Sequence, residues 1–151
     1  MYKIPYTPLP SLTNLFRACF KSSSVNLKRL NNNWVKGNQE GFWLSRSSYS
    51  MRLIGRFRLK ESRKKSINVW IPSYFCNESL DEIRKEKVKI YFYPILENGI
   101  PDLGACKKQM TDQNKPDLFF GVHFFGREID FTKISEFAKS CDAWFIEDAA
   151  H

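Results

Sequence analysis

Cysteine is scarce in this sequence, and long apolar runs are absent. The four cysteines among 151 residues, Cys19, Cys76, Cys106 and Cys141, lie far apart without a CxxC pair. Their spacing therefore predicts neither a zinc site nor a disulfide framework. Reduced thiols are the default expectation for such a chain, which favours a cytoplasmic protein. No run approaches the roughly 18 to 20 apolar residues that cross a bilayer, so we expect no association with a membrane.

Acidic residues are missing from the start of the chain. Residues 1–39 hold six Lys or Arg and no Asp or Glu, which leaves +2 of the formal net charge of +8 for the other 112 residues. Pro5, Pro8 and Pro10 interrupt this segment, and none of its apolar stretches resembles the core of a signal peptide. A targeting peptide or a nucleic-acid-binding arm is thus disfavoured, and residues 1–40 are interpreted as a basic N-terminal lead-in.

The rest of the chain has the composition of one folded domain. Hydrophobic residues make up 42% and aromatic residues 15% of the sequence, which is enough for one core. Short apolar runs rich in β-branched and aromatic residues predict strands over residues 67–71, 88–95, 117–123 and 143–146. The runs at 67–71 and 143–146 are typical of buried strands. A turn is expected at 72–76.

Helix signals lie between these strands. The first predicted helix has Ser45, Ser47 or Ser48 as its N-cap and an apolar face made by Tyr49, Leu53, Ile54 and Phe57. A second is predicted from Asn77, as its cap, to about Glu86, and a third around residues 102–110. A fourth follows Asp130 and turns Ile134, Phe137 and Ala138 to one face. Alternating strands and helices favour an α/β fold with a largely parallel sheet covered on both sides.

The last letters of the chain, IEDAAH, bring polar groups to the end of the final strand. Glu147, Asp148 and His151 would lie at the carboxyl edge of the sheet, where open α/β folds bind their ligands. Because neighbouring strand residues point to opposite faces, Glu147 and Asp148 should serve different surroundings. A helicase-type DEAH box does not fit, since the spacing differs by one alanine and no GxxxxGK[ST] loop precedes it. A metal site at His123 and His151 lacks further ligands at a recognisable spacing.

Several motifs occur together in the order that one family has. The segment GVHFFGREIDFTKISEFAKSCDAWFIEDAAH resembles the DegT/DnrJ/StrS family of pyridoxal-phosphate (PLP)-dependent nucleotide-sugar aminotransferases, which carry VHLFG and then EDAAH or EDAAQ. VWIPSYFCNESL is similar to the family's VIVPSFTFVAT turn, KIYFYPI to its next strand, and SRSSYSMRLI to its turn before the first large helix. The resemblance covers roughly residues 41–151. It implies a three-layer α/β/α sandwich with a mostly parallel sheet, the aspartate-aminotransferase-like large domain.

The resemblance also implies a set of PLP-binding residues. Asp148 matches the carboxylate that pairs with the pyridine nitrogen of the cofactor, and His151 matches the donor to its phenolic oxygen. The phosphate would be bound at the turn formed by Ser47, Ser48 and Tyr49, where unpaired N–H groups begin a helix. Phe75 or Tyr74 would take the place of the stacking aromatic residue, because Cys76 occupies the family's usual position. Glu147, one residue earlier on the strand, should point to the other face and is interpreted as structural.

A further implication concerns activity. The family's Schiff-base lysine lies beyond the EDAAH motif, and every lysine of this chain precedes that motif. Residues 41–151 would then be the N-terminal part of a truncated PLP-binding domain, inactive alone. The complete enzyme would be a homodimer that transfers an amino group from a donor such as glutamate to a keto group of a nucleotide-linked sugar. A non-enzymatic remnant or binding protein, and a PLP-dependent sugar dehydratase, stay open as alternatives. The basic run of residues 52–65 is interpreted as a solvated helix surface, not as a nucleic-acid site.

Overall fold

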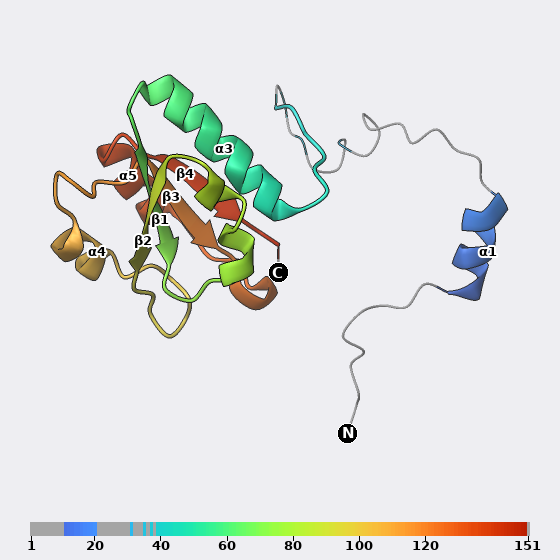
Figure 1. Cartoon of the computed structure of the whole chain (residues 1–151). Coiled ribbons are helices and arrows are strands. Elements are labelled where there is room, and N and C mark those ends of the chain that lie inside the picture. Colours follow the sequence, from blue (N-terminus) through green and yellow to red (C-terminus); the bar gives the residue numbers. More distant parts are fainter. Residues whose placement is uncertain (1–10, 21–30, 32–34, 36, 38, 151) are drawn as a thin grey trace. The chain divides into compact units, whose positions relative to one another are not determined.

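The computed structural model of the chain describes residues 11–20, 31, 35, 37 and 39–150. The chain divides into two compact units, Met1–Trp43 and Leu44–His151 (Figure 1). In the first unit, the short amphipathic helix α1 spans Leu12–Phe20. The amide of Asn31 donates a hydrogen bond to the carbonyl of Gly41 at 2.9 Å and accepts one from the indole of Trp43. Whether residues 1–40 act as a lead-in stays a prediction.

The second unit is built on a four-stranded, fully parallel sheet in the order β2-β1-β3-β4. Its strands are β1 (Ile67–Pro72), β2 (Val88–Tyr93), β3 (Leu118–Val122) and β4 (Trp144–Asp148). All five residues of β3 and five of the six in β1 are buried, which is why these central strands read as continuous apolar runs. The positions of the four predicted strands are thus confirmed, within two residues at each end. The predicted burial of the last one is wrong, because β4 lies at the edge of the sheet and none of its five residues is buried.

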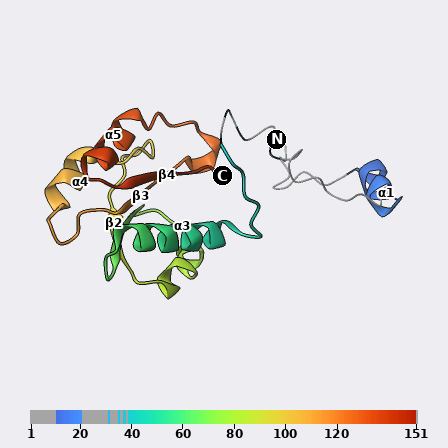
Figure 2. The same cartoon turned by 90° about the horizontal axis from the view of Figure 1, so that it is seen from above.

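Helices cover both faces of the sheet. Figure 2 shows α3 (Ser47–Ser62) on one side and α4 (Leu103–Gln109) and α5 (Thr132–Ser140) on the other. One apolar cluster fills the space under α3 and a second lies under α4 and α5. The predicted face of α5 is confirmed, since Ile134, Phe137 and Ala138 are all buried. The α/β class and its layered arrangement are therefore as the sequence predicts.

The predicted helix from Asn77 to Glu86 is wrong. Two 3₁₀ turns, η1 (Asn77–Leu80) and η2 (Ile83–Lys85), stand in its place. Leu80 and Ile83, three residues apart, are both fully buried, and a three-residue period brings both to one side. The side chain of Asn77 does not cap a helix, because its oxygen accepts a hydrogen bond from Arg84 at 2.7 Å.

Helix α3 exists as predicted, but it buries a different face. Tyr49, Leu53 and Phe57 are 42%, 40% and 59% exposed, and only Ile54 of the predicted face packs against the core. The buried positions of α3 are Met51, Gly55 and Arg58. Gly55 allows this packing, because a Cβ atom there would lie only 3.3 Å from the side chain of Ile83.

The caps of α3 and α5 also differ from the prediction. Neither Ser45, Ser47 nor Ser48 caps α3, which starts after Arg46 without a side-chain cap. Phe131 precedes α5, so Asp130 lies one residue outside the predicted cap position. Its carboxylate still accepts the backbone N–H of Thr132 at 2.9 Å, which satisfies one of the unpaired donors of the first turn.

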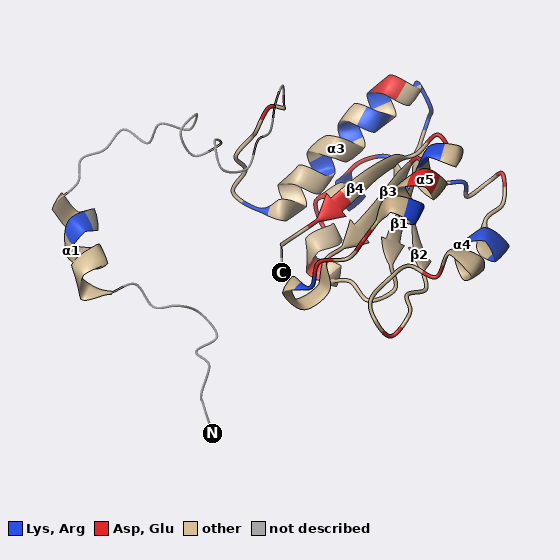
Figure 3. Cartoon of the chain, turned by 180° about the vertical axis from the view of Figure 1, so that it is seen from behind, with Lys and Arg blue, Asp and Glu red and all other residues tan. Residues whose placement is uncertain are grey.

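The basic run of residues 52–65 is mainly a solvated surface, as predicted, because five of its seven Lys and Arg side chains are exposed: Arg56, Lys60, Arg63, Lys64 and Lys65. Arg52 and Arg58 are the exceptions. Arg52 donates to Glu86 at 2.7 Å and to Glu82 at 3.0 Å, and Arg58 is buried against Glu61 and Asp142. Figure 3 shows basic residues distributed along α3 and acidic residues at the end of β4. None of the helices in the described part of the chain has the length and apolarity that a membrane span requires.

Candidate functional site

Four segments that are distant in sequence meet at the carboxyl edge of the sheet. The end of β4, the segment after β1, the turn after β3 and the first residue of α3 line a cavity of about 350 Å³, which we call the Asp148 cavity. It is lined by Ser47, Tyr74, Phe75, Cys76, Ser79, Phe124, Asp148 and Ala150. Of the residues proposed from the sequence, Ser47, Phe75 and Asp148 are thus brought together.

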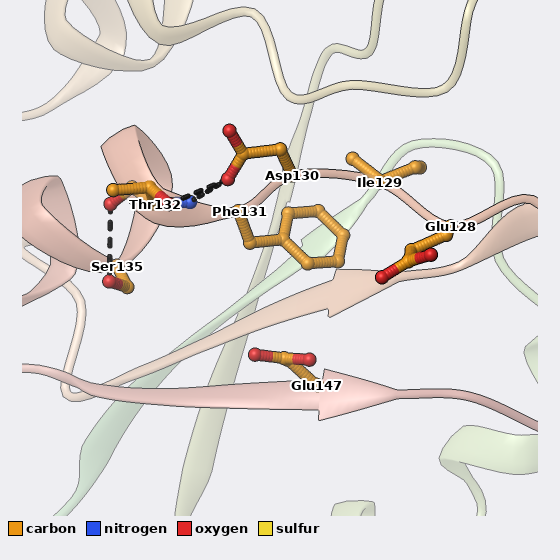
Figure 4. Close-up of a pocket in the computed structure, with 7 residues that line it drawn as sticks. All are labelled: Glu128, Ile129, Asp130, Phe131, Thr132, Ser135 and Glu147. Carbon is orange, nitrogen blue, oxygen red and sulfur yellow. Dashed lines mark hydrogen bonds between the residues drawn. The ribbon is translucent and has the colours of Figure 1, made fainter.

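Asp148 and Glu147 serve opposite sides of the strand end. The Asp148 carboxylate is half-buried in its cavity and accepts the backbone N–H of Ala150 at 3.0 Å. Glu147 lines a separate cavity of about 560 Å³, where Figure 4 shows it on β4, below Phe131. Its carboxylate also lies 3.3 Å from Nε2 of His123. The alternation of a β-strand produces this separation, as predicted.

The N-terminus of α3, which carries the partial positive charge of the helix dipole, lies at the Asp148 cavity. Arg46 precedes the helix in an extended conformation, and its side chain accepts no hydrogen bond from the N–H groups of the first turn. The early N–H groups of this 16-residue helix are therefore suited to an anion. Ser47 lines the cavity, whereas Ser48 and Tyr49 line a different one with Glu78 and neighbouring charged residues. The predicted trio is divided between the two cavities.

Aromatic side chains form one wall of the Asp148 cavity. Phe75 is half-buried and packs against the apolar cluster under α3. Tyr74 is 59% exposed, and its ring centroid lies 5.6 Å from that of Phe124. The cavity thus combines a carboxylate, an apolar aromatic wall and a helix N-terminus, a set of groups that suits a planar, anionic small molecule.

The sequence predicts a cofactor contact for His151 and disfavours a metal site at His123. His151 lies outside the described residues, so its proposed contact is not described. The ring of His123 is held on both sides, because Nδ1 accepts the N–H of Ile129 at 3.1 Å and Nε2 lies beside Glu147. Among the residues that the structure describes, no group of three His, Cys, Asp or Glu side chains is arranged to hold a metal ion.

Cys76 is a member of the cavity that sequence reasoning did not propose. Its thiol is exposed and lines the Asp148 cavity. A hydrogen bond from the Ser79 side chain lowers the pKa of this thiol, and backbone N–H groups of residues 78 and 79 act in the same direction. A larger fraction of Cys76 is therefore thiolate at neutral pH than for an ordinary cysteine.

We expect Cys76 to react with iodoacetamide faster than the exposed Cys19 at pH 7, since thiolate is the reactive form. Removing the donor in Ser79→Ala should raise the pKa of Cys76 and slow its alkylation several-fold. Mass spectrometry of tryptic peptides over time measures both rates in one sample, and Cys19 serves as the internal reference. Equal rates at the two cysteines would contradict the hydrogen bond from Ser79.

Known proteins share the fold of this chain in part. No family model matches the chain. A structure of E. coli GDP-4-keto-6-deoxy-D-mannose-3-dehydratase with bound hydrated PLP superimposes with a TM-score of 0.54 and 19% identity, over 68% of this chain and 27% of that one. A serine hydroxymethyltransferase of Mycoplasma mobile is 36% identical over 62 residues, 40% of this chain and 15% of that protein. The chain therefore spans less than a third of each. Its described α/β core resembles part of the large domain of a PLP-dependent enzyme.

Proposed function

We propose that this chain forms the cofactor-binding part of a PLP-dependent enzyme that acts on a keto group of a nucleotide-linked sugar. The observation that supports the proposal best is the Asp148 cavity, which gathers Asp148, Phe75 and the start of α3 at the carboxyl edge of a parallel sheet. The same edge binds ligands in open α/β folds generally. The motif resemblance and the fold match support the same assignment independently of the cavity.

The residues of the cavity fit PLP in their chemistry. Asp148 would hold a proton on the pyridine nitrogen through a charge-assisted hydrogen bond. Phe75 would lie against the ring, and Ser47 with the first N–H groups of α3 would bind the phosphate. When bound there, PLP supplies an electron sink for the substrate. Ser48 and Tyr49, which line the other cavity, are dropped from the proposed phosphate site.

Two reactions are candidates for the complete enzyme. The sequence motifs favour an aminotransferase of the DegT/DnrJ/StrS family, with an amino donor such as glutamate. The fold match to a sugar dehydratase favours a PLP-dependent dehydration instead. The side chain at the Schiff-base position distinguishes them, because transamination needs a lysine there to move protons. We propose a cytoplasmic homodimer for the complete enzyme in either case.

Titration of the chain with PLP tests the proposal. We expect saturable binding of one PLP per chain, competed by inorganic phosphate, and followed by fluorescence quenching. Ser47→Glu should weaken it by at least about 10-fold, since a carboxylate would then repel the phosphate. The same change should leave the fold intact, because an acid in the first turn stabilises a helix.

Ser62→Glu is the matched control, because it places the same charge at the far end of α3, about 22 Å away. Its PLP affinity should equal that of the original chain. Because no lysine follows Lys139, borohydride should trap no stoichiometric lysine adduct. Absence of saturable binding, or equal losses in both glutamate variants, would refute the proposed site.

A further inference from the structure

Three aromatic rings cluster beside the Asp148 cavity. Tyr74 and Phe124 line the cavity, and the ring centroid of Phe125 lies 6.2 Å from that of Tyr74 and 6.3 Å from that of Phe124. Phe124 is buried, whereas Tyr74 and Phe125 are 59% and 71% exposed. One buried ring therefore supports two rings that present large apolar surfaces to water beside the cavity.

The backbone holds Phe125 in this position at a conformational cost. Phe125 has φ 57° and ψ 34°, the left-handed region, which costs a residue with a side chain about 1–2 kcal/mol. Gly126, the next residue, also has a positive φ of 69°, so the turn contains two consecutive left-handed residues. Glycine would adopt the conformation of Phe125 without strain. Backbone strain of this kind clusters at ligand-binding sites, which makes the exposed ring of Phe125, beside the cavity, a candidate for contact with a ligand.

We propose, on the basis of the proposed function, that Phe125 and Tyr74 stack on the planar base of the substrate's nucleoside diphosphate. The Asp148 cavity measures about 350 Å³, near the lower limit of ligand pockets at about 300–1,000 Å³. A cofactor with a reacting sugar fills such a volume, so the base must lie outside it. The two exposed rings are placed there, and aromatic rings accept any nucleobase because every base has a π-face.

Titration of the chain with GDP and UDP, probed with Phe125→Gly, tests the inference. Glycine removes the ring and keeps the backbone conformation, while the strain it relieves is offset by the greater freedom of the unfolded chain. The affinity for the nucleotides should fall about 5- to 150-fold, the range for loss of one stacked base. The melting temperature should stay unchanged, and binding of pyrophosphate, which has no base, should be equal in both proteins.

Phe57→Ala provides the matched control, since this phenylalanine is also exposed but lies ten residues along α3 from Ser47, about 15 Å. It should bind GDP and UDP as the original chain does. The inference is overturned if the nucleotides bind no better than pyrophosphate, if Phe125→Gly binds them normally, or if that variant melts at a clearly lower temperature. If the chain still binds PLP in any of these three outcomes, only the inference about the base is refuted. If the chain does not bind PLP, the proposed function is refuted as well.

Discussion

Replacing Phe119 by alanine is expected to lower the free energy of unfolding by about 3–5 kcal/mol. Phe119 is fully buried in β3, its ring stacks on Tyr93 at 4.6 Å, and it meets the edge of Phe137 at 5.9 Å. The flanking strands are hydrogen-bonded to β3 and cannot collapse into the space that the ring leaves. Since small domains are stable by only about 5–15 kcal/mol, the urea midpoint measured by circular dichroism should fall sharply.

The matched control is again Phe57→Ala, which removes the same ring from an exposed position on α3. Its effect on the free energy of unfolding should stay within about 0.5 kcal/mol. Phe119 contributes aromatic packing between β3 and α5, and Phe57 does not. Similar losses in the two variants would mean that β3 is not the buried centre of the sheet.

The strands could be predicted because each is a short run rich in β-branched and aromatic residues, although only β1 and β3 are mostly buried. The buried face of α3 could not, because hydrophobicity alone selects Tyr49, Leu53 and Phe57. Gly55 is buried because the helix approaches Ile83 closely there. Arg58 is buried because its guanidinium pairs with Glu61 and Asp142 and lies 5.5 Å over the ring of Trp144. Apart from the Arg58–Glu61 pair, which lies within α3, these are tertiary contacts, which no periodicity within one helix contains.

The candidate site, like the fold, could be predicted only in part. Strand alternation separates Asp148 from Glu147, and the edge rule for parallel sheets locates Asp148 where ligands bind. The division of Ser47 from Ser48 depends on how the first turn of α3 meets the loop after β1, which the sequence does not specify. Cys76 and Phe124 enter the cavity from segments nearly 50 residues apart. Such neighbours are visible only once the chain is folded.

Exchanging Asp148 for asparagine is expected to weaken PLP binding by about 10- to 150-fold, the equivalent of 1.5–3 kcal/mol for one hydrogen bond to a charged group. Asparagine has almost the same shape, and its oxygen can still accept the N–H of Ala150, which Asp148 holds at 3.0 Å. The loop after β4 should therefore keep its conformation. The lost quantity is the negative charge that would keep the pyridine nitrogen protonated. PLP dissociation constants and melting temperatures measured on the same preparations separate the two effects.

Glu147→Gln is the control that makes this experiment specific to the Asp148 cavity. It removes the same charge from the adjacent residue, but that side chain lines the other cavity beside His123. We expect PLP affinity within about twofold of the original chain, because an exposed carboxylate on the far face is screened by solvent. If only the total negative charge at the sheet edge mattered, both variants would lose PLP affinity equally. A larger loss in Glu147→Gln would assign the pyridine nitrogen to the cavity under Phe131, and an unchanged Asp148→Asn would remove Asp148 from the proposed cofactor site.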